Sequence, residues 1–517
     1  INLNGQATGT RITMVSSTEG THYHFNVSAA SPSASYVNVR DSDASGGSQI
    51  NATVGCYDST GNTNWSFYYE CVWTGTSSND WNTAGNWTSC NSTIPGTGSN
   101  ATINLSSASS TVTTSSDISF RNLTIGGDTT YTNKLTLTKN ITSGTDVTIN
   151  SNGTLEQKNA WATALSISGS LTITGADASH KGTLTHADNS TSEAYRVNLS
   201  ISGNLTVDAN GQINVDGLGY DKLYGPGNGG TGECASASYG GEGGKSINGT
   251  GGTTYGSITT PVNLGSGGGY YGSSGTGGGA ISLSVTGAAT INGTVSSSGT
   301  GSFCSTGSGG SVNISSATIS GSGSILAAGG SYSDSNVGQS GGGRIAVKLS
   351  SGTDFGSITI KAYGGSAASQ VQKGAAGTVY LQKSTDTADH GELAVDNQSS
   401  STLCQATYRT TLLNGSGSSS YQFARLNLTN AGILGIDSND SLDVSVTTIT
   451  GDSDDRNEGI WLQDSATLTL ASGALSWTNY FIRLGRSSNF SPSPSSITVG
   501  DKADLVLDQA YNTSFAY

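Results

Sequence analysis

The densest group of acidic residues in the sequence is the run Gly451-Asp-Ser-Asp-Asp-Arg-Asn-Glu458. Its carboxylates at Asp452, Asp454, Asp455 and Glu458 are of the ligand type that Ca²⁺ prefers, and their number suffices for part of a coordination shell. The run matches no hydrolase motif, and a solvated turn between strands accounts for the same residues. We keep it as the candidate site for structural calcium and predict no other cofactor.

Two stretches near the N-terminus are weaker candidates for metal binding. Asp41-Ser-Asp-Ala-Ser-Gly46 begins like an EF-hand loop, but Ala52 stands at the twelfth position, where that motif requires Glu. His22 and His24 lie on one face of an expected strand, where solvent-exposed histidines explain the pattern as well as a metal does. A third ligand is not visible in the sequence, so neither stretch predicts a metal site.

The sequence carries no recognisable catalytic motif. It contains no GxSxG, no HExxH and no Walker loop. Glycine strings such as GGGYYGSSGTGGG lack a flanking helical pattern, which excludes a phosphate cradle at a helix N-terminus. A polysaccharide-degrading β-helix enzyme would need clustered carboxylates, or a basic residue with Ca²⁺, on one outer face. We predict that the protein is not an enzyme and keep polysaccharide cleavage as the third of three interpretations.

Six cysteines show no CxxC metal spacing and suggest three candidate pairs. Cys71 and Cys90 bracket a short tryptophan-rich segment that a disulfide would close. The other candidate pairs are Cys234 with Cys304, both in glycine-rich insertions, and Cys56 with Cys404, which can also pair across subunits. Unpaired buried thiols are the alternative. Disulfides would fit an oxidising, extracellular setting.

The glycosylation motif N-x-S/T occurs 22 times. Much of this frequency follows from a chain rich in Asn, Ser and Thr, and many of these Asn residues would sit in strands or corners where a glycan clashes. The candidates that we single out are Asn86, Asn122, Asn204, Asn292 and Asn427.

The composition favours an ordered all-β chain. It has 75 glycines, 6 prolines and only 11% charged residues among 517. Low hydrophobicity with abundant Gly and Ser can also mean disorder, but disorder usually comes with charge and without β-branched alternation. Thr, Val and Ile alternate from end to end, which favours strands, and Gly and Ser supply the corners between them.

A repeat between Gly277 and Gln382 defines the expected architecture. A glycine run followed by a short alternating strand occurs four times, with strands opening at Ile281, Val312, Ile345 and Val379, which are 31, 33 and 34 residues apart. One such unit cannot bury its own apolar side, whereas a stack of them can. We predict a β-solenoid, specifically a right-handed parallel β-helix with glycine-rich loop insertions along one edge.

The chain divides into three expected regions. Residues 1–70 resemble the end rungs of a solenoid, residues 71–99 form a tryptophan-rich connecting or capping motif, and residues 100–517 form the main solenoid. Residues 217–280 are a long Gly- and Tyr-rich insertion, either a folded flap or a contact surface. Aromatic residues of these segments are the candidates for a contact surface: Trp73, Trp81, Trp87, Tyr220, Tyr224, Tyr239, Tyr270 and Tyr271. For the tryptophans, packing over the solenoid end is the alternative to a sugar-binding platform.

The tryptophan motif carries a family resemblance. The pattern W-x-G-x(5)-W-x-x-A-x-N-W, beginning at Trp73 and followed by Pro95 and a strand at 101–103, resembles the start of autotransporter-like and adhesin-like β-helix repeats in large bacterial surface proteins. The stretch from Ser35 to Trp65 resembles the segment that precedes the motif there. The resemblance covers about a fifth of the chain and implies the architecture and a surface location more than any ligand.

Charge and hydropathy narrow the possible partners. A net charge of −14 and a pI of about 4.6 argue against nucleic acid and against anionic membranes. No window approaches the apolar length needed to span a bilayer. The N-terminus lacks Met and signal-peptide features, so we expect a processed product or a piece of a longer protein.

We expect an extracellular or cell-surface protein with a structural or adhesive role. Neither end shows the cap that usually shields a terminal rung, which suggests end-to-end stacking of rod-like solenoids into a filament or surface fibre. The second interpretation is a carbohydrate-binding module that contacts surface glycans or another cell surface.

Overall fold

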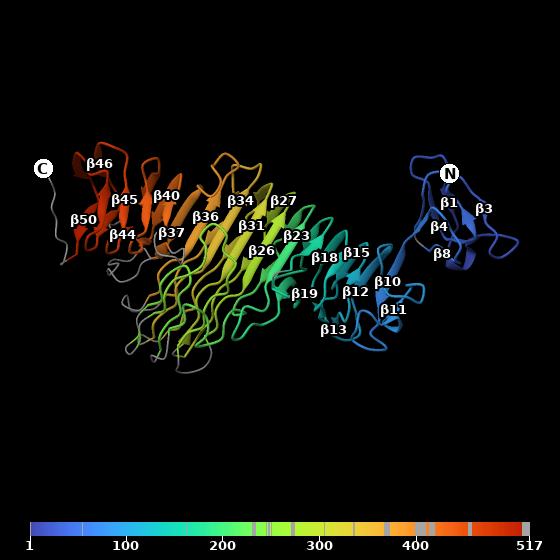
Figure 1. Ribbon diagram of the computed structural model, residues 1–517. Coiled ribbons are helices and arrows are strands. Elements are labelled where there is room, and N and C mark those ends of the chain that lie inside the picture. Colours follow the sequence, from blue (N-terminus) through green and yellow to red (C-terminus); the bar gives the residue numbers. More distant parts are fainter. Residues whose placement is uncertain are drawn as a thin grey trace. The chain divides into compact units, whose positions relative to one another are not determined.

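The computed structural model describes residues 2–53, 55–161, 163–229, 234–244, 246, 249, 251–269, 275–303, 305–333, 337–366, 373–398, 410–412, 419–452 and 457–508. These residues form strands and two short 3-10 turns, η1 (Thr8–Thr10) and η2 (Ala84–Asn86), and no α-helix (Figure 1). No described helix is long and apolar enough to cross a membrane. The chain splits into two compact units: 1–159 with 165–183 and 201–203, and 160–164 with 184–200 and 204–517.

The first unit begins with three small parallel sheets. Their strands are β1 (Asn2–Asn4), β4 (Ser33–Ser35), β7 (Ile50–Ala52) and β9 (Trp65–Phe67); β2 (Ile12–Val15), β5 (Val37–Arg40) and β8 (Tyr57–Asp58); and β3 (Tyr23–His24) with β6 (Ser42–Asp43). Val37, Val39, Ile50 and Trp65 belong to a buried apolar cluster of this region. Residues 2–67 therefore have a small core of their own.

The rest of the first unit is a stack of parallel strands with an isoleucine ladder inside. Its strands include β10 (Tyr69–Trp73), β11 (Trp87–Thr88), β12 (Ser99–Ile103), β15 (Asn122–Ile125), β18 (Asp146–Ile149) and β21 (Leu171–Ile173), then β13 (Ser110–Thr113), β16 (Asn133–Leu137) and β19 (Gly153–Gln157), then β14 (Ile118–Ser119) and β17 (Ile141–Ser143). Ile103, Ile125, Ile149 and Ile173 are register partners and fully buried. Three further strands of the chain are β20 (Leu165–Ile167), β22 (Gly182–His186) and β23 (Val197–Ile201).

The second unit opens with three parallel sheets that the chain visits in turn, which we call the first stack. Its strands are β24 (Leu205–Val207), β27 (Ala288–Ile291) and β32 (Thr318–Ser320); β25 (Gly211–Asn214), β28 (Thr294–Ser296), β33 (Ser324–Leu326) and β35 (Thr359–Lys361); and β26 (Ala280–Val285), β31 (Ser311–Ser316), β34 (Arg344–Leu349) and β36 (Thr378–Gln382). Ile281, Val312, Ile345 and Val379 pair in register. The four repeats found in the sequence thus stack on one another, and the long parallel sheets are compatible with the predicted β-solenoid.

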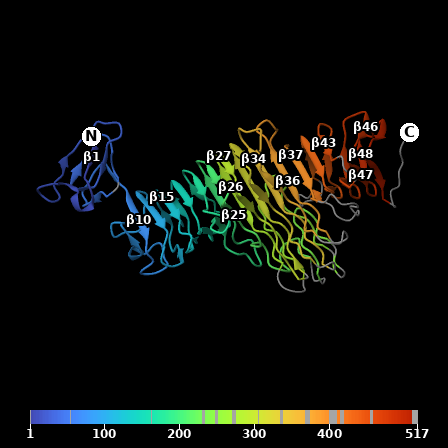
Figure 2. The same ribbon diagram turned by 180° about the vertical axis from the view of Figure 1, so that it is seen from behind.

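Glycine-rich segments lie beside this stack and form what we call the glycine layer. Its segments are 235–244, 264–269, 275–279, 297–300, 307–310, 327–330, 337–343, 362–366 and 373–377, and most of their residues are buried. Figure 1 shows them as green to orange traces without arrowheads that run side by side, and Figure 2 shows the same array from behind. Backbone hydrogen bonds join neighbouring segments, so the layer is a packed part of the fold.

Hydrogen bonding in the glycine layer repeats every third residue. In 307–310 the first and fourth N–H groups donate to 297–300, the second donates to 264–269 and the third to 337–343. In 337–343 the fourth and seventh N–H groups likewise both donate to 327–330. A β-strand alternates between two opposite sides, whereas a three-residue repeat is typical of a polyproline-II-type helix. Segments 307–310 and 337–343 thus bond to neighbouring segments on three sides, as extended helices of this type can.

A second stack follows the first, and the strand direction reverses between them. Its strands are β37 (Glu392–Asp396), β40 (Arg425–Thr429) and β43 (Thr448–Gly451); β38 (Thr410–Leu412), β41 (Ile433–Ile436), β44 (Gly459–Leu462), β47 (Phe481–Leu484) and β50 (Asp504–Leu507); β39 (Ser420–Gln422), β42 (Ser441–Asp443), β45 (Thr467–Thr469) and β48 (Asn489–Ser491); and β46 (Ala474–Trp477) with β49 (Ser496–Val499). β36 pairs antiparallel with β37, whereas β37 and β40 are parallel.

The two stacks use opposite faces of the sheet that they share. Val379 continues the inward ladder of the first stack, and its neighbour Tyr380 points to the other face because strand side chains alternate. Leu393 lies across from Tyr380 in the antiparallel ladder. Tyr380, Leu393, Phe423 and Leu426 all belong to the core cluster of the second stack. The second core is therefore built on the face that was outermost in the first.

Gly309 offers a direct test of the glycine layer. A Cβ at this position would lie 2.3 Å from Ala327 O and 2.5 Å from Gly343 N, both backbone atoms, whereas a Cβ at Gly96 would meet nothing within 4 Å. We expect Gly309→Ala to lower the free energy of unfolding by at least about 2 kcal/mol, because the neighbouring backbones cannot move apart without losing hydrogen bonds. Gly96→Ala is the matched control, and denaturant unfolding is the measurement. Equal unfolding midpoints for the two variants would contradict the close packing of the layer.

Candidate functional site

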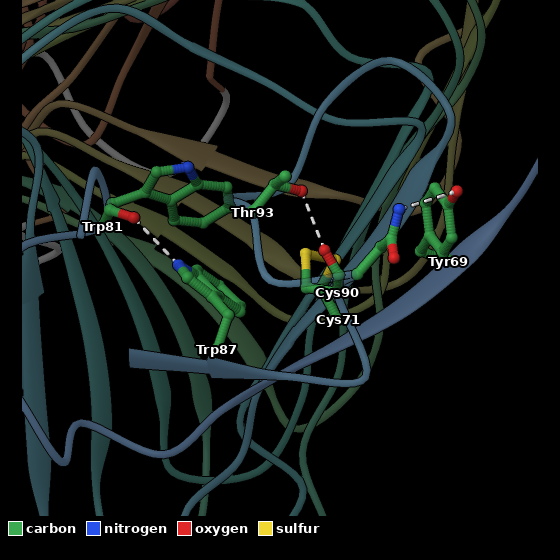
Figure 3. The surroundings of a disulfide bond; sticks show 7 residues. Tyr69, Cys71, Trp81, Trp87, Cys90 and Thr93 are labelled. Atoms are coloured by element: carbon green, nitrogen blue, oxygen red, sulfur yellow. Dashed lines mark hydrogen bonds between the residues drawn. A yellow bond between two sulfur atoms is a disulfide. The ribbon is translucent and has the colours of Figure 1, made fainter. Parts of the chain in front are cut away.

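The three tryptophans of the sequence motif form a buried cluster. Trp73 lies on β10 and pairs across the antiparallel ladder with Trp87 on β11. The Trp81 and Trp87 rings meet edge to face with centroids 4.7 Å apart, and the Trp87 indole N–H donates to the Trp81 carbonyl at 2.8 Å (Figure 3). Their exposed fractions are 2%, 0% and 6% for Trp73, Trp81 and Trp87. They pack as a core, so the contact surface considered for them is wrong.

A disulfide closes this cluster. Cys71 and Cys90 are bonded, with Cα atoms 4.6 Å apart and a separation of 19 positions in the sequence, and both are buried (Figure 3). The Thr93 hydroxyl donates to the Cys90 carbonyl at 2.8 Å, which fixes the turn after the disulfide. The covalent loop thus holds β10 and β11 together around the tryptophans.

Removal of this disulfide should destabilise the tryptophan cluster. We expect the double variant Cys71→Ala, Cys90→Ala to have a free energy of unfolding about 3 kcal/mol lower than that of the wild type, because a closed loop of this length restricts the unfolded chain. Tryptophan fluorescence during urea unfolding measures the change. Addition of reductant should lower the midpoint of the wild type and leave that of the variant unchanged. A variant with the wild-type midpoint would show that packing alone holds the cluster.

The other cysteines meet different outcomes. Cys234 is disulfide-bonded, while Cys304 and Cys404 lie outside the described residues. Cys56 is a free thiol, so its expected pairing with Cys404 is not formed. Its sulfur is buried and lies 3.4 Å from the Ala34 carbonyl, inside the small N-terminal core. Burial raises the pKa of this thiol, which keeps it protonated.

The tyrosines of the 217–280 insertion hold it against the sheet. Tyr239 is fully buried, its ring lies 4.5 Å from the Tyr255 ring, and its hydroxyl is 2.7 Å from the Ser311 hydroxyl. The Arg344 guanidinium lies over the Tyr239 ring at 5.7 Å, and its Nε donates to the Tyr255 carbonyl at 2.9 Å. Burial raises the pKa of Tyr239 to about 12. Tyr239 is therefore an anchor, and its assignment to a contact surface is wrong.

The remaining tyrosine candidates differ in exposure. Tyr224 is 46% exposed and Tyr220 is partly buried. Tyr270 and Tyr271 lie outside the described residues.

Part of the insertion forms a strap, residues 254–264. The strap crosses the outer face of β31 and β34 and carries Ile258 into the core cluster of the second stack.

Most of the glycosylation candidates act as hydrogen-bond acceptors between rungs. The side-chain oxygens of Asn122, Asn204 and Asn292 accept from the backbone N–H groups of Asp146, Ala288 and Ser322, at 3.3, 2.9 and 3.2 Å. Asn427 lies within β40. Asn86 is fully buried, with its oxygen bound to two backbone N–H groups and its amide donating to the Asp80 carbonyl. A glycan has no room at Asn86, so this candidate is wrong.

The candidate calcium site is only partly described. Asp454 and Asp455 lie outside the described residues. Asp452 accepts a hydrogen bond from the Asn430 N–H at 2.7 Å, and Glu458 is fully buried. Within the described ranges, no three His, Cys, Asp or Glu residues cluster closely enough to hold a metal ion.

A cavity lies where the strand direction reverses, and we call it the reversal cleft. Its volume is about 530 Å³. It is lined by the strap residues 254–259, by Asp389 and His390 of the hairpin between β36 and β37, and by residues 420–423 of β39 and its end. Ile258 and Phe423 form an apolar floor, and each is less than 5% exposed.

Ion pairs hold the hairpin that forms one wall of this cleft. Arg425 on β40 makes a bidentate pair with Asp386, at 2.9 and 2.7 Å, and its Nε donates to Glu392 at 3.2 Å. The Asp386 side chain is only 6% exposed, and its bonds to Arg425 lower its pKa below the usual range. The Lys348 amine donates to Asp389 at 2.7 Å, which fixes that carboxylate at the rim.

The sequence does not predict this cleft: the hairpin residues 383–391 and residues 420–423 both fall within the expected main solenoid of 100–517. The available signal was the turn-rich stretch STDTADHG between two alternating strands, which is typical of a hairpin. No local sequence pattern predicts that residues 420–423 and the strap lie next to this hairpin.

No known protein family, characterised protein or solved structure matches this chain. The site must therefore be judged on its own geometry, which is that of a small, rigid-walled cleft of mixed polarity.

The Asp386 ion pair predicts a pH dependence. Because the folded pKa of Asp386 is lowered, the pair stabilises the protein above the unfolded pKa of about 4, and this contribution is lost as the pH falls through the folded value. We expect Asp386→Asn to lower the free energy of unfolding by about 1–2 kcal/mol at pH 7. Below about pH 4 the stability of the variant should decrease less with falling pH than that of the wild type. Urea unfolding across pH measures both. A variant with an unchanged acid profile would assign that fall to other carboxylates.

Proposed function

We propose that this chain is an extracellular structural or adhesive protein, in which a β-solenoid serves as scaffold and associates end to end with further copies. Continuous parallel ladders support the scaffold role, because each rung offers the next one a row of backbone donors and acceptors. The resemblance of the tryptophan motif to surface β-helix repeats and the Cys71–Cys90 disulfide support an extracellular location.

The observation that carries the proposal is an exposed apolar strand edge. β50 pairs in register with β47 and, within the described part of the chain, with no other strand. Its residues Val506 and Leu507 are 38% and 45% exposed. Leu507 continues the ladder of the buried Leu484, so a further rung placed there would cover it. Such an edge is a template for strand addition.

We also propose that both stacks wind as right-handed coils. Crossovers between parallel strands are right-handed in almost all proteins. When the strand direction reverses at a shared sheet, the coil remains right-handed only if its core moves to the other face of that sheet. The positions of Tyr380 and Leu393 on one core face support this arrangement.

Association through the β50 edge can be tested by placing a charged side chain on this strand. We expect the wild type to form oligomers or filaments in sedimentation velocity and negative-stain images, and Val506→Lys to shift them toward single chains by at least about tenfold in dissociation constant, because edge charges oppose strand pairing. Val446→Lys is the matched control, since Val446 is 72% exposed in a turn away from this edge. A monodisperse wild type, or equal effects of the two variants, would refute association through this edge.

A further inference from the structure

We propose that the reversal cleft binds a neutral pyranose unit of a glycan. This inference concerns a binding site and does not rest on end-to-end association, so either one can fail without the other.

The size and rigidity of the cleft fit a ligand of this kind. A volume of about 530 Å³ falls within the range of small-molecule sites and admits one or two sugar rings. Two of the three walls are held in place by bonds already described: the strap by Arg344 and Tyr255, and the hairpin by Arg425 and Lys348. The Tyr255 hydroxyl also donates to the Leu264 carbonyl at 2.5 Å, which closes the strap on itself. Walls fixed before binding reduce the ordering that a ligand must induce.

The lining combines an apolar floor with polar groups at the rim. Ile258 and Phe423 lie at the floor, with Tyr255 and Tyr421 beside them. A pyranose has a face of C–H groups that such a floor accommodates and a ring of hydroxyl groups that need hydrogen bonds. The structure therefore pairs both parts of a sugar with a matching surface.

Two oriented acceptors stand where the hydroxyl groups would lie. The Gln422 amide nitrogen donates to Asp443 at 2.8 Å, which fixes the amide and leaves its oxygen as an acceptor for the cleft. The Asp389 carboxylate is held by Lys348 and has further lone pairs for hydroxyl donors. Ser257, Thr259 and Ser420 add hydroxyls that can donate or accept. These polar groups can orient a ligand that carries hydroxyl groups, whereas an apolar ligand would leave them without hydrogen bonds.

Charge favours a neutral sugar over an anionic one. Among the residues that line the cleft, Asp389 is acidic and none is Lys or Arg. Its side chain is 59% exposed, so it meets a ligand at the entrance. The Lys348 amine that pairs with Asp389 does not line the cleft, so a uronate or a sulfated sugar would meet the carboxylate first, which opposes binding.

Saturation-transfer NMR on the full chain tests the proposal. The probes are methyl pyranosides of glucose, galactose, mannose and N-acetylglucosamine, and methyl glucuronide is the anionic comparison. Each is used at about 10 mM, a concentration at which binding with a millimolar dissociation constant can be detected. We expect transfer to at least one neutral sugar and at least fivefold less transfer to the glucuronide. Absence of transfer from every neutral sugar, or stronger transfer to the glucuronide, would overturn the proposal.

Variants locate the binding. Ser420→Trp fills the cleft from an exposed position of β39 and should reduce the transfer at least fivefold. Ser441→Trp is the matched control, because Ser441 is the register partner of Ser420 on the next strand and does not line the cleft. Asp389→Asn, which keeps the shape of the rim, should also weaken neutral sugars and reduce the discrimination against glucuronide. Unchanged transfer in Ser420→Trp and Asp389→Asn, with melting curves like the wild type, would place binding elsewhere and refute the assignment.

Discussion

Backbone hydrogen bonding between neighbouring extended segments is the interaction on which this structure depends. Only 33% of the residues are hydrophobic, and the apolar interior of a rung is a few side chains wide, as at Ile125 and Ile149. Every buried N–H and C=O must still find a partner. Parallel sheets meet this need on two sides of each strand, and the glycine layer meets it on three. Glycine is required in that layer because side chains would hold the backbones apart, as the contact at Gly309 shows.

The core changes from the face of Val379 to the face of Tyr380 where the strand direction reverses between β36 and β37. A hairpin without this change of face would invert the hand of the coil. The change of face is therefore what our proposal of two right-handed stacks requires. This change of face leaves a region that neither stack fills completely. The strap covers part of it, and the reversal cleft is the remainder.

The sequence revealed the repeats but not how the segments between them pair. The positions of Ile281, Val312, Ile345 and Val379 could be found because the period and the alternation are local. The glycine runs were interpreted as corners along one edge, because glycine is a turn residue in local terms. Their bonding joins segments far apart in the chain, such as Ala375 N to Glu242 O. The cleft was missed for the same reason, since its three walls come from distant residues.

Tyr239 shows how packing can reverse an expectation based on composition. A tyrosine in a Gly- and Ser-rich insertion suggests an exposed contact residue. Here it is buried between Tyr255 and Arg344, where its ring faces a cation and its hydroxyl has a partner in Ser311. The insertion is thereby part of the folded body, and its tyrosines secure the strap that borders the cleft.

Hydrogen exchange of the native protein tests the central claim most directly. None of the strands β1–β50 lies within the segments of the glycine layer, but we expect its amides to be as firmly bonded as those of the sheets. Amides of 307–310 and 340–343 should therefore exchange as slowly as those of β31 and β34 and much more slowly than those around Gly96. Exchange in these segments as fast as in the turn at Gly96 would contradict the account, because it would show that the glycine-rich segments are not part of a hydrogen-bonded layer.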